Sequence, residues 1–141
     1  MARGNGIKVV NKWAQIPKNA PMIVQRYIAR PHLINGTKYD LRIYVLVTSI
    51  NPLVIYLYDE GLVRFASNKY ETDNASLSDV FMHLTNYSIN KNNSAYTPNE
   101  DPECRQGHKW TLASLWQHFA EAGIDSKVRI AFYPWFAVHP C

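Results

Sequence analysis

The residues best suited to chemistry follow one another at every second position. Lys38, Asp40 and Arg42 have this spacing, and alternate residues of a β-strand project from the same face. A lysine ammonium acts as a point charge and an arginine guanidinium as a planar fork, so the row suits phosphates and carboxylates. The solvated face of an ordinary strand shows the same pattern, and both interpretations stay open at this point.

Three further features carry groups that bind anions. Arg64 adds a cation on an expected neighbouring strand, where it could converge with Arg42. Residues 4–6, Gly-Asn-Gly, follow Arg3 and form a small glycine-rich turn; such turns can present backbone N–H groups to phosphates. Residues 83–86, His-Leu-Thr-Asn, are a compact cluster of donors and acceptors, which by composition is more often a hydrogen-bonded turn than a site.

These residues need a sheet to hold them. The sequence predicts strands at residues 22–28, 38–49, 53–58 and 62–67. Tight turns are expected at Asn51-Pro52 and at residues 59–61, Asp-Glu-Gly, so that the last three strands form an antiparallel meander. The face of the central strand opposite its charged row carries Leu41, Ile43, Val45 and Val47.

One amphipathic helix is expected beside the sheet. Leu112, Leu115, Trp116 and Phe119 recur at helical spacing and predict a helix over 108–122, which Gly123 would end. Residues 68–80 and the Asn-rich residues 90–107 are expected to be loops. The aromatic, proline-interrupted residues 130–141 fit no regular element. The predicted fold class is therefore α+β, an antiparallel sheet with a flanking helix.

Composition limits the class of protein. The 141 residues allow one sizeable domain. Fifteen Lys and Arg against 11 Asp and Glu give a charge of +4, which fits an acidic peptide, a nucleotide or nucleic acid and selects none of them. Cys104 and Cys141 make no disulfide framework, so a reducing compartment is expected. Neither a signal peptide nor a membrane-spanning run is expected.

Other kinds of site find little support. Cys104 and His108 are four residues apart, but no further zinc ligands stand at suitable spacing, and no metal site is predicted. Interleaved aromatic and basic residues make single-stranded nucleic acid conceivable, yet no RNA-binding signature is present and most aromatics fall on positions expected in the core. A Gly-x-Ser-x-Gly elbow is lacking. The residues alone predict a basic α/β module that binds anions.

Taken together, six stretches resemble the tubulin–tyrosine-ligase-like family of ATP-grasp ligases. They are ARGNGI (2–7), VQRYIARP (24–31), KYDLRIYVLVTS (38–49), GLVRFAS (61–67), HLTNYS (83–88) and GHKW (107–110). No single stretch is specific, but their order and approximate spacing also match. The form of the last two is most similar to the glutamylase branch, close to the tubulin polyglutamylases. The resemblance implies a partial ATP-grasp domain over residues 1–124, followed by a tail at 125–141 that does not resemble the family.

The resemblance implies an ATP-dependent carboxylate–amine ligase. ATP would phosphorylate a glutamate side chain of the acceptor, typically in an acidic tubulin tail, and the amine of free L-glutamate would attack the acyl phosphate. An isopeptide branch would form, and ADP and phosphate would leave. Tubulin tails and microtubules are the implied partners, with neither nucleic acid nor membrane. The implied location is the cytoplasm and cytoskeleton, with the cilium or basal body as a further candidate.

The resemblance also implies residue roles. Arg42 and Arg64 would act at the reacting groups, with Arg42 facing the phosphate or the acceptor carboxylate and Arg64 holding the carboxylate of the incoming amino acid. Tyr87, Ser88 and Lys109 would lie near that amino acid. The implied ATP contacts are Arg3 and Gly4 in the loop over the phosphates, Gln25, Arg26, Tyr27 and Ile28 at the adenine, Lys38, Tyr39 and Asp40 at phosphate, sugar or an ordering cation, and Thr85 and Asn86.

The chain also departs from the family pattern. It begins inside the glycine loop, and the family's magnesium ligands, an Asp and a Glu-x-Asn arrangement, are expected beyond its end. The resemblance therefore implies a truncated and inactive piece of an enzyme. Two alternatives stay open within the family: a non-catalytic chain that binds nucleotide or an acidic tail, and a glycylase or tyrosine ligase. A basic nucleic-acid-binding module is the remaining alternative.

Overall fold

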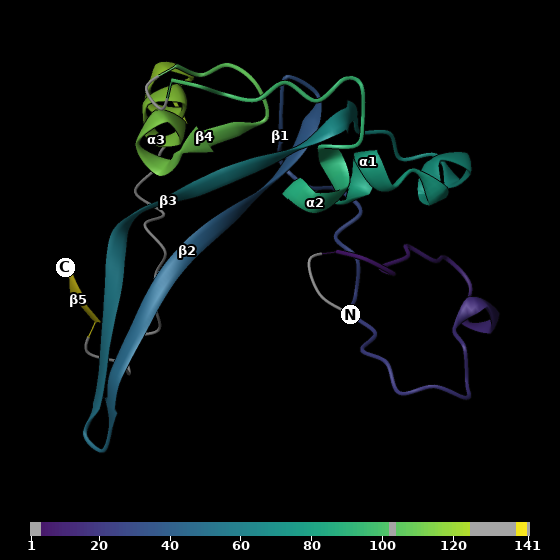
Figure 1. The fold of residues 1–141 in the computed structure, drawn as a ribbon, viewed down its shortest axis with the longest axis horizontal. Helices are drawn as coiled ribbons and strands as arrows, with labels where there is room; N and C mark the ends of the chain where they lie inside the picture. The colour runs from purple at the N-terminus through teal and green to yellow at the C-terminus, as the bar shows by residue number, and fades with distance from the viewer. Residues whose placement is uncertain (1–3, 102–103, 125–137, 141) are drawn as a thin grey trace. The chain divides into compact units, whose positions relative to one another are not determined.

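The computed structural model describes residues 4–101, 104–124 and 138–140. The chain divides into two compact units. The first unit contains residues 1–39 and 65–96, and the second contains residues 40–64 and 97–141. Figure 1 shows the elements in chain order.

The strands form one sheet in the order β1-β2-β3-β4, with β5 also paired to β3. β1 and β4 are antiparallel to their partners, whereas β5 is parallel to β3. The prediction of a strand over 38–49 and of a turn at Asn51-Pro52 is confirmed, because the turn joins β2 to β3. The bounds are β1 Leu33–Ile34, β2 Thr37–Ile50, β3 Leu53–Lys69, β4 Lys109–Thr111 and β5 Val138–Pro140.

The predicted turn at residues 59–61 is wrong, and so is the three-stranded meander. β3 is a single strand that runs through Asp-Glu-Gly without interruption. Gly61 is buried, and a β-carbon built on it would lie 2.4 Å from the carbonyl oxygen of Arg42. Glu60 Oε1 accepts a hydrogen bond from the backbone N–H of Ala113 at 3.2 Å. Gly61 thus allows two backbone segments to approach each other closely, which is a common reason for glycine inside a strand.

Two further predictions of secondary structure are corrected. Residues 22–28 were predicted as a strand, but they form neither helix nor strand. No strand of the described sheet pairs with them. The tail was expected to hold no regular element, yet β5 at its end pairs Val138 with Ile55 of β3. Residues 130–137 and 141 lie outside the described residues.

In the first unit, short helices follow the end of β3. They are η2 Asn74–Ser78, α1 Val80–His83 and α2 Tyr87–Asn90, and η1 Trp13–Gln15 lies earlier in the chain. Asp73 and Asp79 begin two of them, since each side chain accepts a hydrogen bond from a backbone N–H two residues on. Residues 68–80, predicted as a loop, therefore include a helical turn. Ile34, Phe65, Ala66 and Met82 are buried here.

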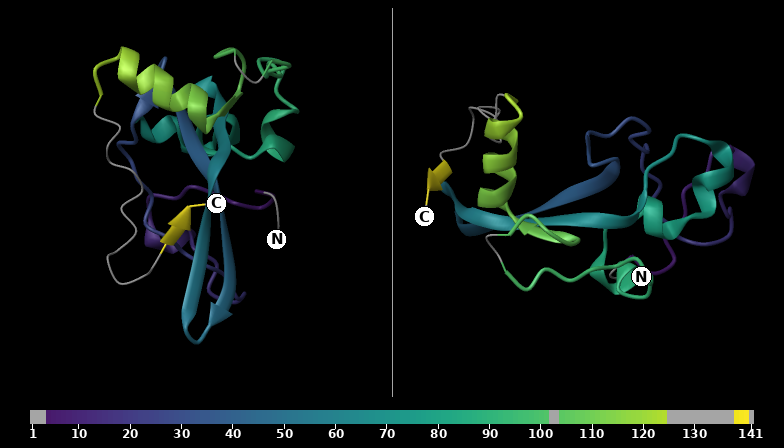
Figure 2. Two further views of the ribbon diagram at one scale, coloured as in Figure 1. Left: turned by 90° about the vertical axis from the view of Figure 1, so that its left-hand side faces the viewer. Right: turned by 90° about the horizontal axis from the view of Figure 1, so that it is seen from above.

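In the second unit, helix α3, Leu112–Glu121, begins directly where β4 ends (Figure 2). Thr111 caps it, because Thr111 Oγ1 accepts from Ser114 N at 3.0 Å. The predicted helix over 108–122 is confirmed in its body, but its first residues belong to β4. Gly123 follows the helix with φ +68°, as expected for a C-terminal stop. Leu112 and Leu115 are buried, together with Val63 and Trp110.

Much apolar surface of β2 and β3 remains exposed in the described structure. Val45 and Val47, expected on one apolar face, are about half exposed, and Leu46 on the other face is 60 % exposed. Tyr44 and Tyr58 are also exposed, so the expectation that aromatics on strands lie in the core is wrong for these two. Among the described residues, no helix has the length and apolarity to cross a bilayer.

Candidate functional site

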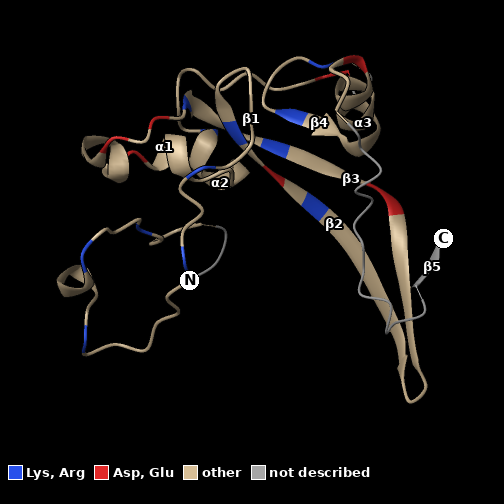
Figure 3. Cartoon of the chain, turned by 180° about the vertical axis from the view of Figure 1, so that it is seen from behind, with Lys and Arg blue, Asp and Glu red and all other residues tan. Residues whose placement is uncertain are grey.

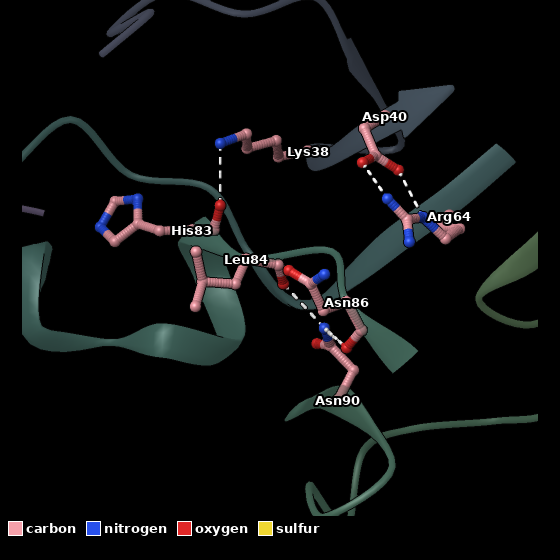
Figure 4. A network of polar contacts seen from close by, with 7 residues as sticks. All are labelled: Lys38, Asp40, Arg64, His83, Leu84, Asn86 and Asn90. Atoms are coloured by element: carbon pink, nitrogen blue, oxygen red, sulfur yellow. Dashed lines mark hydrogen bonds and ion pairs between the residues drawn. The ribbon is translucent and has the colours of Figure 1, made fainter. Parts of the chain in front are cut away.

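In the first unit, the Lys38 side chain is held by two neighbouring residues, His83 and Tyr27, and Figure 4 shows its contact with His83. Its Nζ donates to the carbonyl oxygen of His83 at 2.8 Å and approaches the Tyr27 hydroxyl at 3.4 Å. It also lies 4.6 Å from the centroid of the Tyr27 ring, within the range of a cation–π contact. An ammonium fixed in this way is suited to meet a phosphate.

Behind Lys38, the imidazole of His83 is almost fully buried, at 3 % exposure. Its Nδ1 lies 2.8 Å from the Tyr27 hydroxyl and its Nε2 lies 3.0 Å from the carbonyl oxygen of Ser76. Burial raises the pKa of the Tyr27 phenol far above its usual value, and the neighbouring Tyr70 raises it further. Tyr27 is therefore a neutral phenol at physiological pH.

The glycine turn of the first unit approaches the segment after α1. Gly4 is buried with φ +89°, and a β-carbon built on it would lie 2.7 Å from Asn86 Oδ1. Any other residue at position 4 would clash and would be strained, since only glycine adopts this φ at little cost. The structure thus brings together two residues expected at the nucleotide, Gly4 and Asn86.

Asn90 fixes the backbone around Thr85 and Asn86. Its side chain has no exposed surface. Oδ1 accepts from Ser67 N at 2.9 Å and from Ser67 Oγ at 2.7 Å. Nδ2 donates to the carbonyl oxygens of Leu84 at 2.7 Å and Asn86 at 3.1 Å, as Figure 4 shows. The amide therefore uses all of its usual hydrogen-bonding capacity, and Thr85 lies between two anchored carbonyls.

In the second unit, Arg64 and Asp40 form a two-pronged ion pair between adjacent strands. Nε lies 2.9 Å from Oδ1 and Nη2 lies 2.5 Å from Oδ2. The hydrogen bond to Asp40 raises the pKa of Arg64, which burial alone would lower. Arg64 was expected to hold a substrate carboxylate and Asp40 to lie near the sugar or a cation, but here each is the other's partner. The pair orients the guanidinium fork.

A second cation stands opposite Arg64 in the same sheet. Arg64 of β3 and Lys109 of β4 are partners in the antiparallel register. Like charges directly opposite one another destabilise a strand pair, and Asp40 offsets part of that cost. Both residues were expected near the amino-acid substrate, and the register brings them together. Arg42 is exposed, and its expected convergence with Arg64 stays a prediction.

The other expected site residues are less constrained. Gln25, Arg26 and Ile28 are exposed beside Tyr27, and Arg3 lies outside the described residues. Tyr39 is half-buried, with its hydroxyl 3.0 Å from His32 Nδ1.

The expected site residues in and before α2 differ in their exposure. Thr85 is 7 % exposed, whereas the Tyr87 ring is exposed and packs edge-on against Tyr96. Ser88 lies in α2 and is half-buried. No observation here tests the roles of these residues.

A hollow of about 630 Å³ lies in the first unit, and His83 contributes to its wall. Ile7, Val9, Val10, Leu77 and Val80 give its wall apolar character, and Lys8 adds a cation. None of the residues expected to bind nucleotide lines it. The hollow and the polar contacts of Lys38 are therefore different features.

The described residues do not fit a magnesium site. Within residues 4–101, 104–124 and 138–140, no three His, Cys, Asp or Glu side chains gather closely enough to hold a metal ion. Asp40 is engaged by Arg64. Magnesium prefers several oxygen ligands in octahedral geometry, so no step of the chemistry is assigned to a metal held by these residues.

Sequence reasoning missed the parts played by two of the most constrained residues, Asn90 and His83. Asn90 stands in an Asn-rich stretch that was expected to be a loop, and composition cannot separate a buried asparagine from exposed ones. His83 belonged to a cluster interpreted as more often a hydrogen-bonded turn than a site; it is the last residue of α1, and its ring bonds to Tyr27 and Ser76. Its partner Tyr27 is 56 residues away in sequence, so spacing could not reveal the pair.

Comparison with known proteins identifies the family. The family model described as "Tubulin-tyrosine ligase family" matches residues 1–131. The chain is 58 % identical over 125 residues to tubulin monoglutamylase TTLL4 of Mus musculus, a match that covers 89 % of this chain and 10 % of that protein. It is 48 % identical over 128 residues to tubulin polyglutamylase ttll-5 of Caenorhabditis elegans, covering 89 % of this chain and 18 % of that one.

A third relative extends the match slightly. The chain is 43 % identical over 131 residues to tubulin polyglutamylase TTLL5 of Homo sapiens, covering 92 % of this chain and 10 % of that protein. The chain thus spans about a tenth to a fifth of the length of these relatives. Their names bear out the predicted glutamylase branch and include both mono- and polyglutamylases. The chain belongs to the tubulin–tyrosine ligase family.

Proposed function

We propose that this chain supplies part of the nucleotide-binding and amino-acid-binding machinery of an ATP-dependent tubulin–glutamate ligase with an ATP-grasp fold. The observation that carries the proposal is the register of Arg64 with Lys109. Two cations on adjacent strands, with Asp40 orienting one of them, suit a small dicarboxylate such as L-glutamate better than a neutral amino acid. The relatives named as tubulin glutamylases support the same assignment.

The first unit is proposed to hold the nucleotide. Lys38 would neutralise charge on a phosphate, and the Gly4 turn would bring backbone N–H groups near Asn86. Transfer of a phosphoryl group depends mainly on positioning and on neutralising oxygen charge, so fixed cations and backbone donors suit the task. ATP, when bound, would supply the phosphoryl group that activates the acceptor carboxylate.

Tubulin tails are the proposed acceptor. Residues 4–39 carry six Lys and Arg and no Asp or Glu, and Figure 3 shows this segment with basic positions alone. An acidic peptide would be attracted to such a surface in a salt-dependent manner. The protein would then act at the cytoskeleton, with the cilium or basal body as a candidate site.

The test is incorporation of labelled amino acid into tubulin by the full-length protein. With ATP present, glutamate should be incorporated, while glycine and tyrosine should not. Preferential incorporation of glycine or tyrosine would replace the glutamylase assignment by one of the other ligases of the family. Binding of nucleotide without any incorporation would favour a non-catalytic chain instead.

A further inference from the structure

We propose that Tyr27 and His83 are positioning residues that hold the Lys38 ammonium ready for a nucleotide phosphate. The inference rests on the proposed nucleotide-binding role of Lys38. It gives the Tyr27 side chain a role other than contact with adenine, and it adds His83, to which neither the residue pattern nor the family resemblance assigned a role.

The hydrogen bonds around His83 run in one direction. Ser76 offers only a carbonyl oxygen at 3.0 Å, so His83 Nε2 must carry a proton and donate to it. In the tautomer that carries its proton on Nε2, Nδ1 has a lone pair and accepts from the Tyr27 O–H at 2.8 Å. With its proton committed to His83, the Tyr27 oxygen offers its lone pairs to the Lys38 ammonium at 3.4 Å. The hydrogen bonds therefore run from Lys38 to Tyr27, from Tyr27 to His83 and from His83 to Ser76.

Burial and ring contacts keep this arrangement rigid. The His83 ring meets Tyr27 edge-on at 5.5 Å and Tyr70 edge-on at 5.8 Å. The Tyr70 hydroxyl in turn donates to the carbonyl oxygen of Ala29 at 2.9 Å. The raised pKa of Tyr27 ensures that its hydroxyl keeps the proton that the directional chain needs.

Lys38 receives three constraints from these two residues. His83 supplies the main-chain oxygen at 2.8 Å, and Tyr27 supplies both a hydroxyl oxygen and a ring face. A free lysine side chain would lose much rotamer entropy on binding a ligand. A lysine already held in one orientation loses less, so preorganisation should increase affinity for the phosphate.

A double-mutant cycle on ATP affinity in the full-length protein tests this role. Tyr27→Phe removes the hydroxyl and keeps the ring, and Lys38→Ala removes the ammonium. Tyr27→Phe should raise the Kd for ATP roughly threefold to tenfold in the wild-type background, the effect of one ordinary hydrogen bond. In the Lys38→Ala background it should have no further effect, because positioning residues act only through the group they position. His83→Gln should show the same non-additivity.

The control is Tyr58→Phe, which removes an exposed hydroxyl in the second unit and should leave the Kd unchanged. Thermal unfolding of each variant shows whether the protein remains folded. If Lys38→Ala leaves ATP affinity unchanged, both the nucleotide role of Lys38 and the inference are overturned. If Lys38→Ala weakens binding but Tyr27→Phe acts equally in both backgrounds, or not at all, only the inference is overturned.

Discussion

Replacing Asn90 by alanine should destabilise the protein far more than an ordinary polar substitution. Four hydrogen bonds are lost, but two of the partners keep other bonds. Ser67 Oγ still receives Asn93 Nδ2 at 2.9 Å, and the Asn86 carbonyl still accepts from Ile89 N at 3.0 Å. The Ser67 N–H and the Leu84 carbonyl lose the partner that Asn90 gave them.

Each group left without a partner away from water costs about 1–3 kcal/mol, so the two groups together should lower the free energy of unfolding of Asn90→Ala by roughly 2–6 kcal/mol. Chemical denaturation measures the difference. Asn92→Ala is a matched control, since Asn92 is exposed and its Nδ2 donates to Ser88 O at 3.2 Å; it should stay within about 0.5 kcal/mol of wild type. A loss below about 1 kcal/mol for Asn90→Ala, or one equal to the control, would refute the reasoning.

Two other predictions rest on particular contacts, and a third rests on the family resemblance. Gly61→Ala should cost about 1–3 kcal/mol of stability by overpacking, because its β-carbon would lie 2.4 Å from the Arg42 carbonyl oxygen; a variant as stable as wild type in urea unfolding would contradict the close approach. Arg64→Ala in the full-length enzyme should raise the KM for glutamate about ten- to a hundredfold, the value of a charge-assisted contact, and leave ATP affinity nearly intact; unchanged glutamate kinetics would remove Arg64 from this role. The polypeptide of residues 1–141 alone should incorporate no glutamate into tubulin with ATP and magnesium, because the resemblance assigns metal-bound charge neutralisation to other residues; turnover above a blank without enzyme would show that the metal is held here.

Local patterns predicted the elements whose contacts are local. The alternation in residues 38–49 and the helical spacing of Leu112, Leu115 and Phe119 correspond to β2 and α3, because side chains repeat every second residue on a strand face and every three to four residues on a helix face. Asp-Glu-Gly at residues 59–61 has turn composition, yet it lies inside β3, because Gly61 serves the approach to Arg42 and Glu60 binds the start of α3. Composition reports preference for a conformation and carries no information on such long-range contacts.

For the candidate site too, local sequence patterns predicted part of the arrangement and could not predict the rest. The types and spacing of Lys38, Asp40 and Arg42 suited either an anion-binding face or an ordinary solvated one, and the family resemblance supplied roles for these residues. The ion pair of Asp40 with Arg64 joins residues 24 positions apart, and the bond of Tyr27 to His83 joins residues 56 apart. Such pairs depend on the register of strands and on the packing of short helices, which a single sequence does not specify.

The central claim is that the first unit holds the nucleotide, and hydrogen–deuterium exchange with a non-hydrolysable ATP analogue tests it most directly. In the full-length protein with magnesium, the analogue should slow exchange at the backbone amides of residues 4–7, 25–28 and 84–86, and Lys38→Ala should weaken that protection at a fixed analogue concentration. Unchanged exchange in these three segments at saturating analogue, with protection confined to other parts of the chain, would contradict the account.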